Sequence, residues 1–172
     1  MKPSEFIERW HAEDEPEPLL RFTPQSLVGV SLYAESLSFL LEAGLPAAAA
    51  PFLTFEVPEE VSLPTAAEAW QLPEAYSCFR VIGFNGSGDP LCLDESAAGA
   101  VVHLNHDNEF ERVLMNSSVP QLAESLLVFR SFVQGGASAE LEAWCIEELR
   151  RVDEAAWVLS SFWRDEMSMM KS

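Results

Sequence analysis

Two histidines and three acidic residues fall within nine positions of the chain, 103-HLNHDNEFE-111. Imidazole nitrogens and carboxylate oxygens are ligands for zinc and similar ions. His103 and His106 face opposite sides if the strand is regular, so a metal site requires a bend at Asn105. The EF-hand calcium loop is excluded, because its glycine and its terminal glutamate are absent at the required offsets. A small metal- or ligand-binding domain that uses the His103/His106 turn is one hypothesis.

The glycine-rich stretch 83-GFNGSGDPLCLDES-96 is the candidate for phosphate binding. A P-loop has a lysine and a Ser or Thr after its last glycine, at the start of a helix, to supply charge, a magnesium ligand and aligned N–H groups. Here Asp89 and Pro90 follow the last glycine, and a strand pattern comes next. The dinucleotide fingerprint also requires a helix at this point. The stretch is therefore predicted to be a hairpin turn, with Gly86 and Gly88 at positive φ.

No arrangement of nucleophile and base can be singled out in the sequence. The motif GxSxG fails at Ser87, because Asn85 occupies the position of its first glycine. The 28 acidic residues guarantee that some carboxylates lie close together, so such a pair carries little information about catalysis. We predict that the protein is not an enzyme and needs no cofactor.

The acidic charge is spread unevenly along the chain. The net charge is -18 at pH 7, and between Phe22 and Glu111 there are 13 Asp or Glu residues but a single base, Arg80. A surface built from this stretch repels phosphate backbones and anionic lipid, which argues against binding to nucleic acid or membrane. It attracts a basic protein, although excess acid also serves solubility.

The cysteines and the amino terminus indicate a cytoplasmic protein. Cys78, Cys92 and Cys145 are widely spaced among apolar neighbours, so the sequence suggests neither a disulfide framework nor a CxxC metal site. Residues 1–15 have no apolar signal-peptide core, and no run of 18 apolar residues occurs. A monomer and a dimer are both compatible with the sequence.

The elements that must position these residues form three blocks. Helical periodicity is seen in residues 4–11 and 24–43. It returns in residues 118–134, which begin with a serine cap, and then in 141–152 and 155–170. Between these helices, alternating patterns bounded by turn residues predict strands in 51–60, 76–84, 90–94, 100–106 and 110–116.

This segregation of strands and helices predicts an α+β fold. We expect a single domain over residues 1–172, with a mostly antiparallel or mixed β-sheet on which N-terminal and C-terminal helices pack. An acidic N-terminal arm spans 1–20, and a C-terminal helical extension spans 136–172. At 172 residues, one core is enough to bury roughly 70% of the surface of the unfolded chain.

Three stretches, 37–55, 79–118 and 122–133, together resemble the SUKH superfamily, closest to its fourth group of bacterial immunity proteins. The most specific part is an apolar strand that ends in Ile-Gly, a glycine turn, the strand Pro-Leu-Cys-Leu-Asp, the strand Gly-Ala-Val-Val and an Asn-Ser-Ser cap. The closing 161-SFWRDEM-167 is also similar to the end of these proteins.

The resemblance implies an α+β immunity protein that binds and neutralises a cognate toxin and has no catalysis of its own. Toxins of this class are often nucleases or nucleic-acid deaminases. Such toxins need a positive cleft for their substrate, and an acidic inhibitor can occupy that cleft. The resemblance also implies that a group of residues defines the fold: Gly83, Gly88, Pro90, Asp94 and Gly99.

The partner is therefore expected to be a basic toxin domain, bound at the turn between the last two predicted strands. This turn carries acidic residues without a base among them, so we expect it to project into solvent. Acidic residues on neighbouring connections are expected to extend the face, which gives this set: Asp89, Asp94, Glu95, His106, Asp107, Asn108, Glu109 and Glu111. An intracellular scaffold with no toxin partner is a further alternative.

Overall fold

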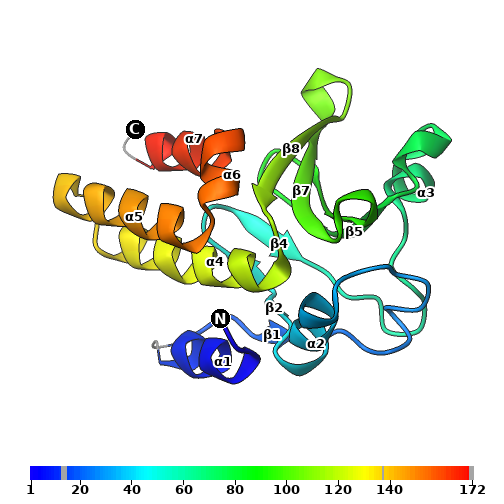
Figure 1. Ribbon diagram of the computed structural model, residues 1–172, viewed down its shortest axis with the longest axis horizontal. Coiled ribbons are helices and arrows are strands. Elements are labelled where there is room, and N and C mark those ends of the chain that lie inside the picture. The colour runs from blue at the N-terminus through cyan, green and yellow to red at the C-terminus, as the bar shows by residue number, and fades with distance from the viewer. Residues whose placement is uncertain (13–14, 137, 171–172) are drawn as a thin grey trace.

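The computed structural model describes residues 1–12, 15–136 and 138–170, and it contains a six-stranded antiparallel sheet (Figure 1). The strands are ordered as they occur in the chain, so each pairs with the next: β3 (Ala48–Ala49), β4 (Leu53–Phe55), β5 (Phe79–Phe84), β6 (Pro90–Asp94), β7 (Ala100–Asn105) and β8 (Glu111–Asn116). A separate two-stranded sheet joins β1 (Leu19–Leu20) to β2 (Leu45–Pro46). The prediction of a mostly antiparallel sheet is confirmed.

Helices precede and follow the sheet. Two helices precede the six-stranded sheet, α1 (Pro3–His11) and α2 (Ala34–Glu42), and a short third helix, α3 (Ala66–Trp70), lies between β4 and β5 in the chain. Four follow β8, and in Figure 1 they lie together on one side of the sheet: α4 (Val119–Gln134), α5 (Ala139–Val152), α6 (Glu154–Leu159) and α7 (Phe162–Met169). The predicted α+β fold, with helices at both ends of the chain, is confirmed.

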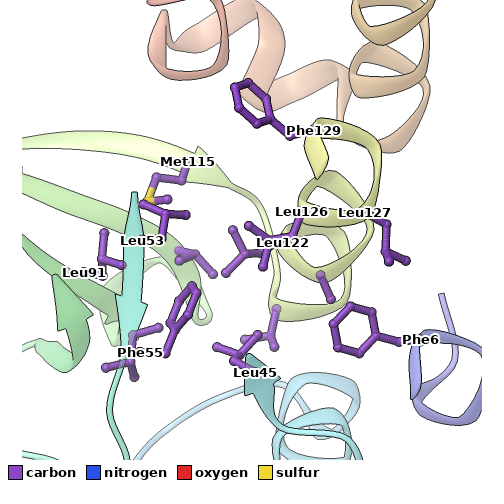
Figure 2. Close-up of a cluster of buried hydrophobic side chains, with 14 of the residues drawn as sticks. Phe6, Leu45, Leu53, Phe55, Leu91, Met115, Leu122, Leu126, Leu127 and Phe129 are labelled. Carbon is purple, nitrogen blue, oxygen red and sulfur yellow. The ribbon is translucent and has the colours of Figure 1, made fainter. Parts of the chain in front are cut away.

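The main core lies between the sheet and α4. Figure 2 shows side chains of the strands, such as Leu53 and Leu91, pointing toward Leu122 and Leu126 on α4. Phe6 reaches the same cluster from α1, at a relative exposure of 0%. The predicted N-terminal arm therefore contributes a helix to the core. Residues 13–14 of that arm, and 137 and 171–172 of the C-terminal extension, lie outside the described residues.

The strand β6 is buried along its whole length because both faces of the sheet are covered there. Leu91 and Leu93 belong to the main core, whereas Cys92 points to a second cluster that includes Ala66 of α3. Pro90 begins the strand, at a position where its missing N–H donor is tolerated.

A buried polar network anchors the C-terminal helices to the end of β8. The Asp153 carboxylate accepts hydrogen bonds from the main-chain N–H of Ser117 (2.6 Å), the Ser117 hydroxyl (2.9 Å) and the N–H of Ala156 (3.1 Å). The indole Nε1 of Trp163 donates to the carbonyl of Met115 (3.1 Å) and to Asn116 Oδ1 (3.3 Å). The helices after Gly136 are therefore part of the same core as the sheet.

Two predicted helices were wrong in their extent. Within residues 24–43 only α2 is an α-helix, because Thr23 and Ser26 cap each other's backbone N–H groups at 3.0 Å and close a turn instead. The segment 155–170 is two helices, α6 and α7, which are separated at Ser160 and Ser161. Local side-chain hydrogen bonds of Ser and Thr compete with the helix in both places.

The strand predicted over 51–60 is limited to β4. Pro51 and Pro58 flank this strand and have no backbone N–H to donate to a ladder. Alternation within the segment is as predicted, since Leu53 and Phe55 are buried while Phe52 is exposed.

The glycine turn joins β5 to β6 as predicted, and its glycines have different roles. Gly88 has φ +85, but Gly86 is not at positive φ. A Cβ at Gly86 would instead lie 2.9 Å from the Phe52 Cβ, so this glycine makes room for a neighbouring side chain. Gly83 has φ +154 and a Cβ there would lie 2.0 Å from the Thr54 carbonyl oxygen, so β4 approaches β5 at this glycine.

Candidate functional site

The turn between β7 and β8 is a 3-10 turn, η3 (His106–Asn108), held in a fixed shape. The Asn105 side chain accepts a hydrogen bond from the Asp107 N–H at 3.0 Å, which bends the chain directly after β7. The carbonyl of Glu109 accepts a hydrogen bond from the Tyr76 hydroxyl at 3.0 Å. The bend at Asn105 that a His103/His106 site requires is therefore present.

The turn exposes its acidic side chains. The side chain of Asp107 is 86% exposed, and Asn108, Glu109 and Glu111 are exposed as well. The next residue, Arg112, directs its guanidinium to the buried carboxylate of Asp94, with 2.7 Å between Nε and Oδ2. Because this base is already paired, the turn keeps its negative charge.

Asp89 connects the acidic turn to the β5–β6 turn. Its Oδ1 accepts hydrogen bonds from the His106 main-chain N–H at 2.9 Å and from the His106 ring Nδ1 at 2.6 Å. Its Oδ2 accepts a hydrogen bond from Asn85 Nδ2 at 2.9 Å, and Asn85 Oδ1 in turn accepts from the Asp89 N–H. Burial alone would raise the pKa of Asp89, but these hydrogen bonds and the nearby His103 ring lower the pKa below its ordinary value.

His103 lies on the inner side of Asp89. Its Nδ1 is 3.3 Å from Asp89 Oδ2 but makes no hydrogen bond, and its ring packs against Phe162 with 5.5 Å between centroids. Burial lowers the pKa of His103, and this effect exceeds the opposite effect of Asp89. The two histidines thus converge on one carboxylate. Among residues 1–12, 15–136 and 138–170, no group of three or more His, Cys, Asp or Glu side chains is arranged to hold a metal ion.

Of the expected acidic face, Asp89 and Asp94 are buried and Glu95 is half-buried. Asp89 and Asp94 are only 5% and 1% exposed. Glu95 pairs with Arg80, with 2.8 Å between Oε2 and Nε, and accepts a hydrogen bond from the Ser31 N–H. The expectation that they extend an exposed edge is corrected, because each of them satisfies donors of neighbouring segments. The exposed acidic turn is hereafter the segment 106–111.

Sequence reasoning missed an apolar groove on the other flank of the β5–β6 turn. It has a volume of about 690 Å³, and its lining includes the segment 48–51, Phe52, Phe84 and Gly86. Phe52 is 70% exposed and Phe84 is 38% exposed. The alternation in 51–60 placed Phe52 opposite Leu53, which was the one signal in the sequence that this side chain is exposed.

The two buried cysteine thiols, Cys92 and Cys145, are poor nucleophiles. Burial raises the pKa of Cys145 to about 12, and the carboxylate of Glu142 adds to this effect. Burial, followed by the nearby Asp94, also raises the pKa of Cys92 far above its ordinary value. Both thiols are therefore protonated at neutral pH, and the thiolate is the reactive form.

The family model described as SUKH-4 immunity protein matches residues 4–168. The chain belongs to the SUKH-4 immunity protein family. The resemblance noted in residues 37–55, 79–118 and 122–133 is confirmed, and the match also covers α1 and the C-terminal helices of this SUKH-4 protein except for Pro3 and Met169. Neither a curated protein nor a solved structure matches the chain.

Family membership supports a toxin-neutralising immunity role for this SUKH-4 protein, which implies that it binds a cognate toxin. In the part of the chain that the structure describes, no helix combines the length and the apolar character needed to cross a membrane.

Proposed function

We propose that this SUKH-4 protein neutralises a basic toxin domain, a nuclease or a nucleic-acid deaminase, by binding it through the exposed acidic turn. Its own role is inhibition by occupancy, without catalysis. Targets of such toxins are nucleic acids, so the encounter takes place in the cytoplasm. The observation that carries the proposal is the exposed carboxylate group of Asp107, Glu109 and Glu111 beside an arginine that is already paired.

The shape of the turn supports this role. A binding surface loses less entropy on association when its backbone is held in place beforehand. Here the buried carboxylate of Asp89 holds the N–H of His106, and the hydroxyl of Tyr76 holds the carbonyl of Glu109. The carboxylates at the tip are therefore presented on a fixed scaffold, although the side chains themselves remain solvated.

The net charge of the protein also supports the proposed binding of a basic toxin domain. A protein with a net charge of -18 attracts a basic domain over a distance of about a Debye length, which raises the association rate. A nuclease or deaminase must present positive charge to its nucleic acid, so the same surface is available to an acidic inhibitor.

Association kinetics test the proposal with the toxin domain encoded beside this chain, in a catalytically inactivated form. The triple variant Asp107→Lys, Glu109→Lys and Glu111→Lys is expected to associate at least tenfold more slowly at low salt, with a smaller deficit at high salt. A matched control reverses three other exposed acids, Glu35, Glu59 and Glu60, for the same change in net charge. An equal loss in both variants would assign the effect to net charge and contradict a docking site at this turn.

Co-expression tests the function itself. Cells that produce the active toxin domain are expected to survive with the wild-type protein and to die without it. Equal killing with and without this protein would remove the proposed immunity function against that toxin.

A further inference from the structure

The apolar groove beside Phe52 lies next to the exposed acidic turn. Asn85, Gly86 and Gly88 of the β5–β6 turn line the groove. The same turn is joined to His106 through Asp89, which accepts hydrogen bonds from Asn85 Nδ2 and from the His106 N–H. One short turn therefore separates the groove from the acidic surface, so a partner of ordinary size that covers one also covers the other.

The groove has the composition of an interface centre. Its lining is apolar and includes the segment 48–51, Phe52, Phe84 and Val133. Its volume of about 690 Å³ is in the range of small-molecule and side-chain pockets. Interfaces commonly combine a desolvated apolar centre, which carries most of the binding energy, with a polar rim. The acidic turn alone supplies only the rim.

The charge around the groove selects its occupant. Among the described residues that line it, Glu17 is the one with an ionisable side chain, and it is exposed. A second copy of this chain would bring another Glu17 and another net charge of -18 to the same place, which disfavours self-association. A basic partner meets complementary charge both at Glu17 and at the acidic turn.

We propose that the groove takes an aromatic or branched aliphatic side chain of the basic toxin domain, with a neighbouring base of the toxin directed to Glu17. This inference rests on the proposed function, and it divides the surface by role. The acidic turn sets the association rate, whereas the groove sets the dissociation rate, since contacts at a desolvated centre are those lost on dissociation.

The decisive variant is Phe52→Gly. Phe52 is 70% exposed and has φ +61, a backbone conformation that glycine adopts without strain, so the fold is expected to survive the substitution. The variant should dissociate from the inactivated toxin domain at least tenfold faster, with its association rate within about twofold of wild type at low and high salt. Phe84→Ser, at the end of β5 and also in the lining of the groove, is expected to act in the same direction.

The control is Leu159→Ser on α6, since Leu159 is 75% exposed and does not line the groove. It should leave both rates unchanged. Unchanged dissociation of Phe52→Gly and Phe84→Ser, with wild-type toxin binding intact, would overturn the groove proposal while leaving the proposed function standing.

Two further outcomes also overturn the proposal. Sedimentation of the free protein is expected to show that Phe52→Gly does not change its association state. A wild-type dimer that this variant converts to a monomer would assign the groove to a second copy. If the wild-type protein binds no basic toxin domain at all, the proposed function and the groove proposal fail together.

Discussion

The buried carboxylate of Asp89 holds His106 by both its main-chain N–H, at 2.9 Å, and its ring Nδ1, at 2.6 Å, although 17 positions separate the two residues. This pair fastens the turn before β6 to the turn after β7. It explains how two surface turns, one acidic and one bordering an apolar groove, keep a fixed relative position.

Replacement of Asp89 by alanine should loosen this connection. The variant leaves the His106 N–H and Asn85 Nδ2 without their acceptor, so the free energy of unfolding is expected to fall by about 1–3 kcal/mol. Hydrogen exchange should rise at the amides of 105–109. Asp89→Asn retains one acceptor oxygen, so its free energy of unfolding should fall less than that of the alanine variant. Unchanged exchange in this turn would show that other contacts hold it.

Acidification should destabilise the protein through His103. Burial lowers its pKa in the folded state below the ordinary 6.5, so the unfolded chain takes up a proton first as the pH falls below 6.5. The contribution of the neutral His103 ring to the free energy of unfolding is therefore fully present above about pH 6.5 and declines below that pH. Urea unfolding of wild type and His103→Gln between pH 7 and 5 should show a smaller decline in the variant. His11→Gln, at an exposed histidine, is the control and should follow wild type.

Glu166 should have the opposite pH dependence. Burial, with a smaller effect of Asp165, raises its pKa to about 7 from the ordinary 4.5. The folded protein therefore holds a proton that the unfolded chain has released, and this stabilisation is lost as the pH rises from 4.5 through 7. Relative to wild type, Glu166→Gln should gain stability between pH 5 and pH 8. If the difference in stability between Glu166→Gln and wild type is constant across that range, Glu166 ionises alike in the folded protein and in the unfolded chain.

The two glycines of the β5–β6 segment should differ in their tolerance of alanine. Gly88→Ala introduces a Cβ into open space at φ +85, so the expected loss is about 1 kcal/mol. Gly83→Ala places a Cβ 2.0 Å from the Thr54 carbonyl oxygen, so β4 and β5 must separate and the loss should be several-fold larger. Thermal melts compare them directly. Similar losses would argue against a close approach of β4 at Gly83.

Asp153 should be one of the most sensitive polar positions. Asp153→Ala removes the acceptor for Ser117 and for the first turn of α6, with an expected loss of about 3 kcal/mol or more. Ser138→Ala, which removes only the cap of α5, is the comparison, and about 1 kcal/mol is expected. Equal losses in urea unfolding would show that the buried network adds nothing to a simple cap.

The sequence by itself determined the local elements whose signals are local. Alternation and turn residues located β5 to β8, because the side-chain period of a strand and the need for positive φ at Gly88 are written in neighbouring residues. The serine cap at Ser118 and the helix behind it were predictable for the same reason. The resemblance to an immunity family also came from the sequence, through the order of these strands and turns.

Tertiary structure decided which charged residues are available to a partner. In the sequence, Asp89 and Asp94 are indistinguishable from Asp107, since all three lie at or beside the end of a short predicted strand in an acidic region. Their donors, His106 and Arg112, lie 17 and 18 positions away, and only the register of β6 on β7 and of β7 on β8 brings them together.

The groove beside Phe52 likewise exists only in the folded chain, because its walls come from 48–54, the β5–β6 turn, α4 and Met170. Burial and contact between distant segments depend on the packing of the whole sheet. The alternation of residues along the chain indicates which face of a strand a side chain occupies, but it does not indicate which distant segment packs against that face.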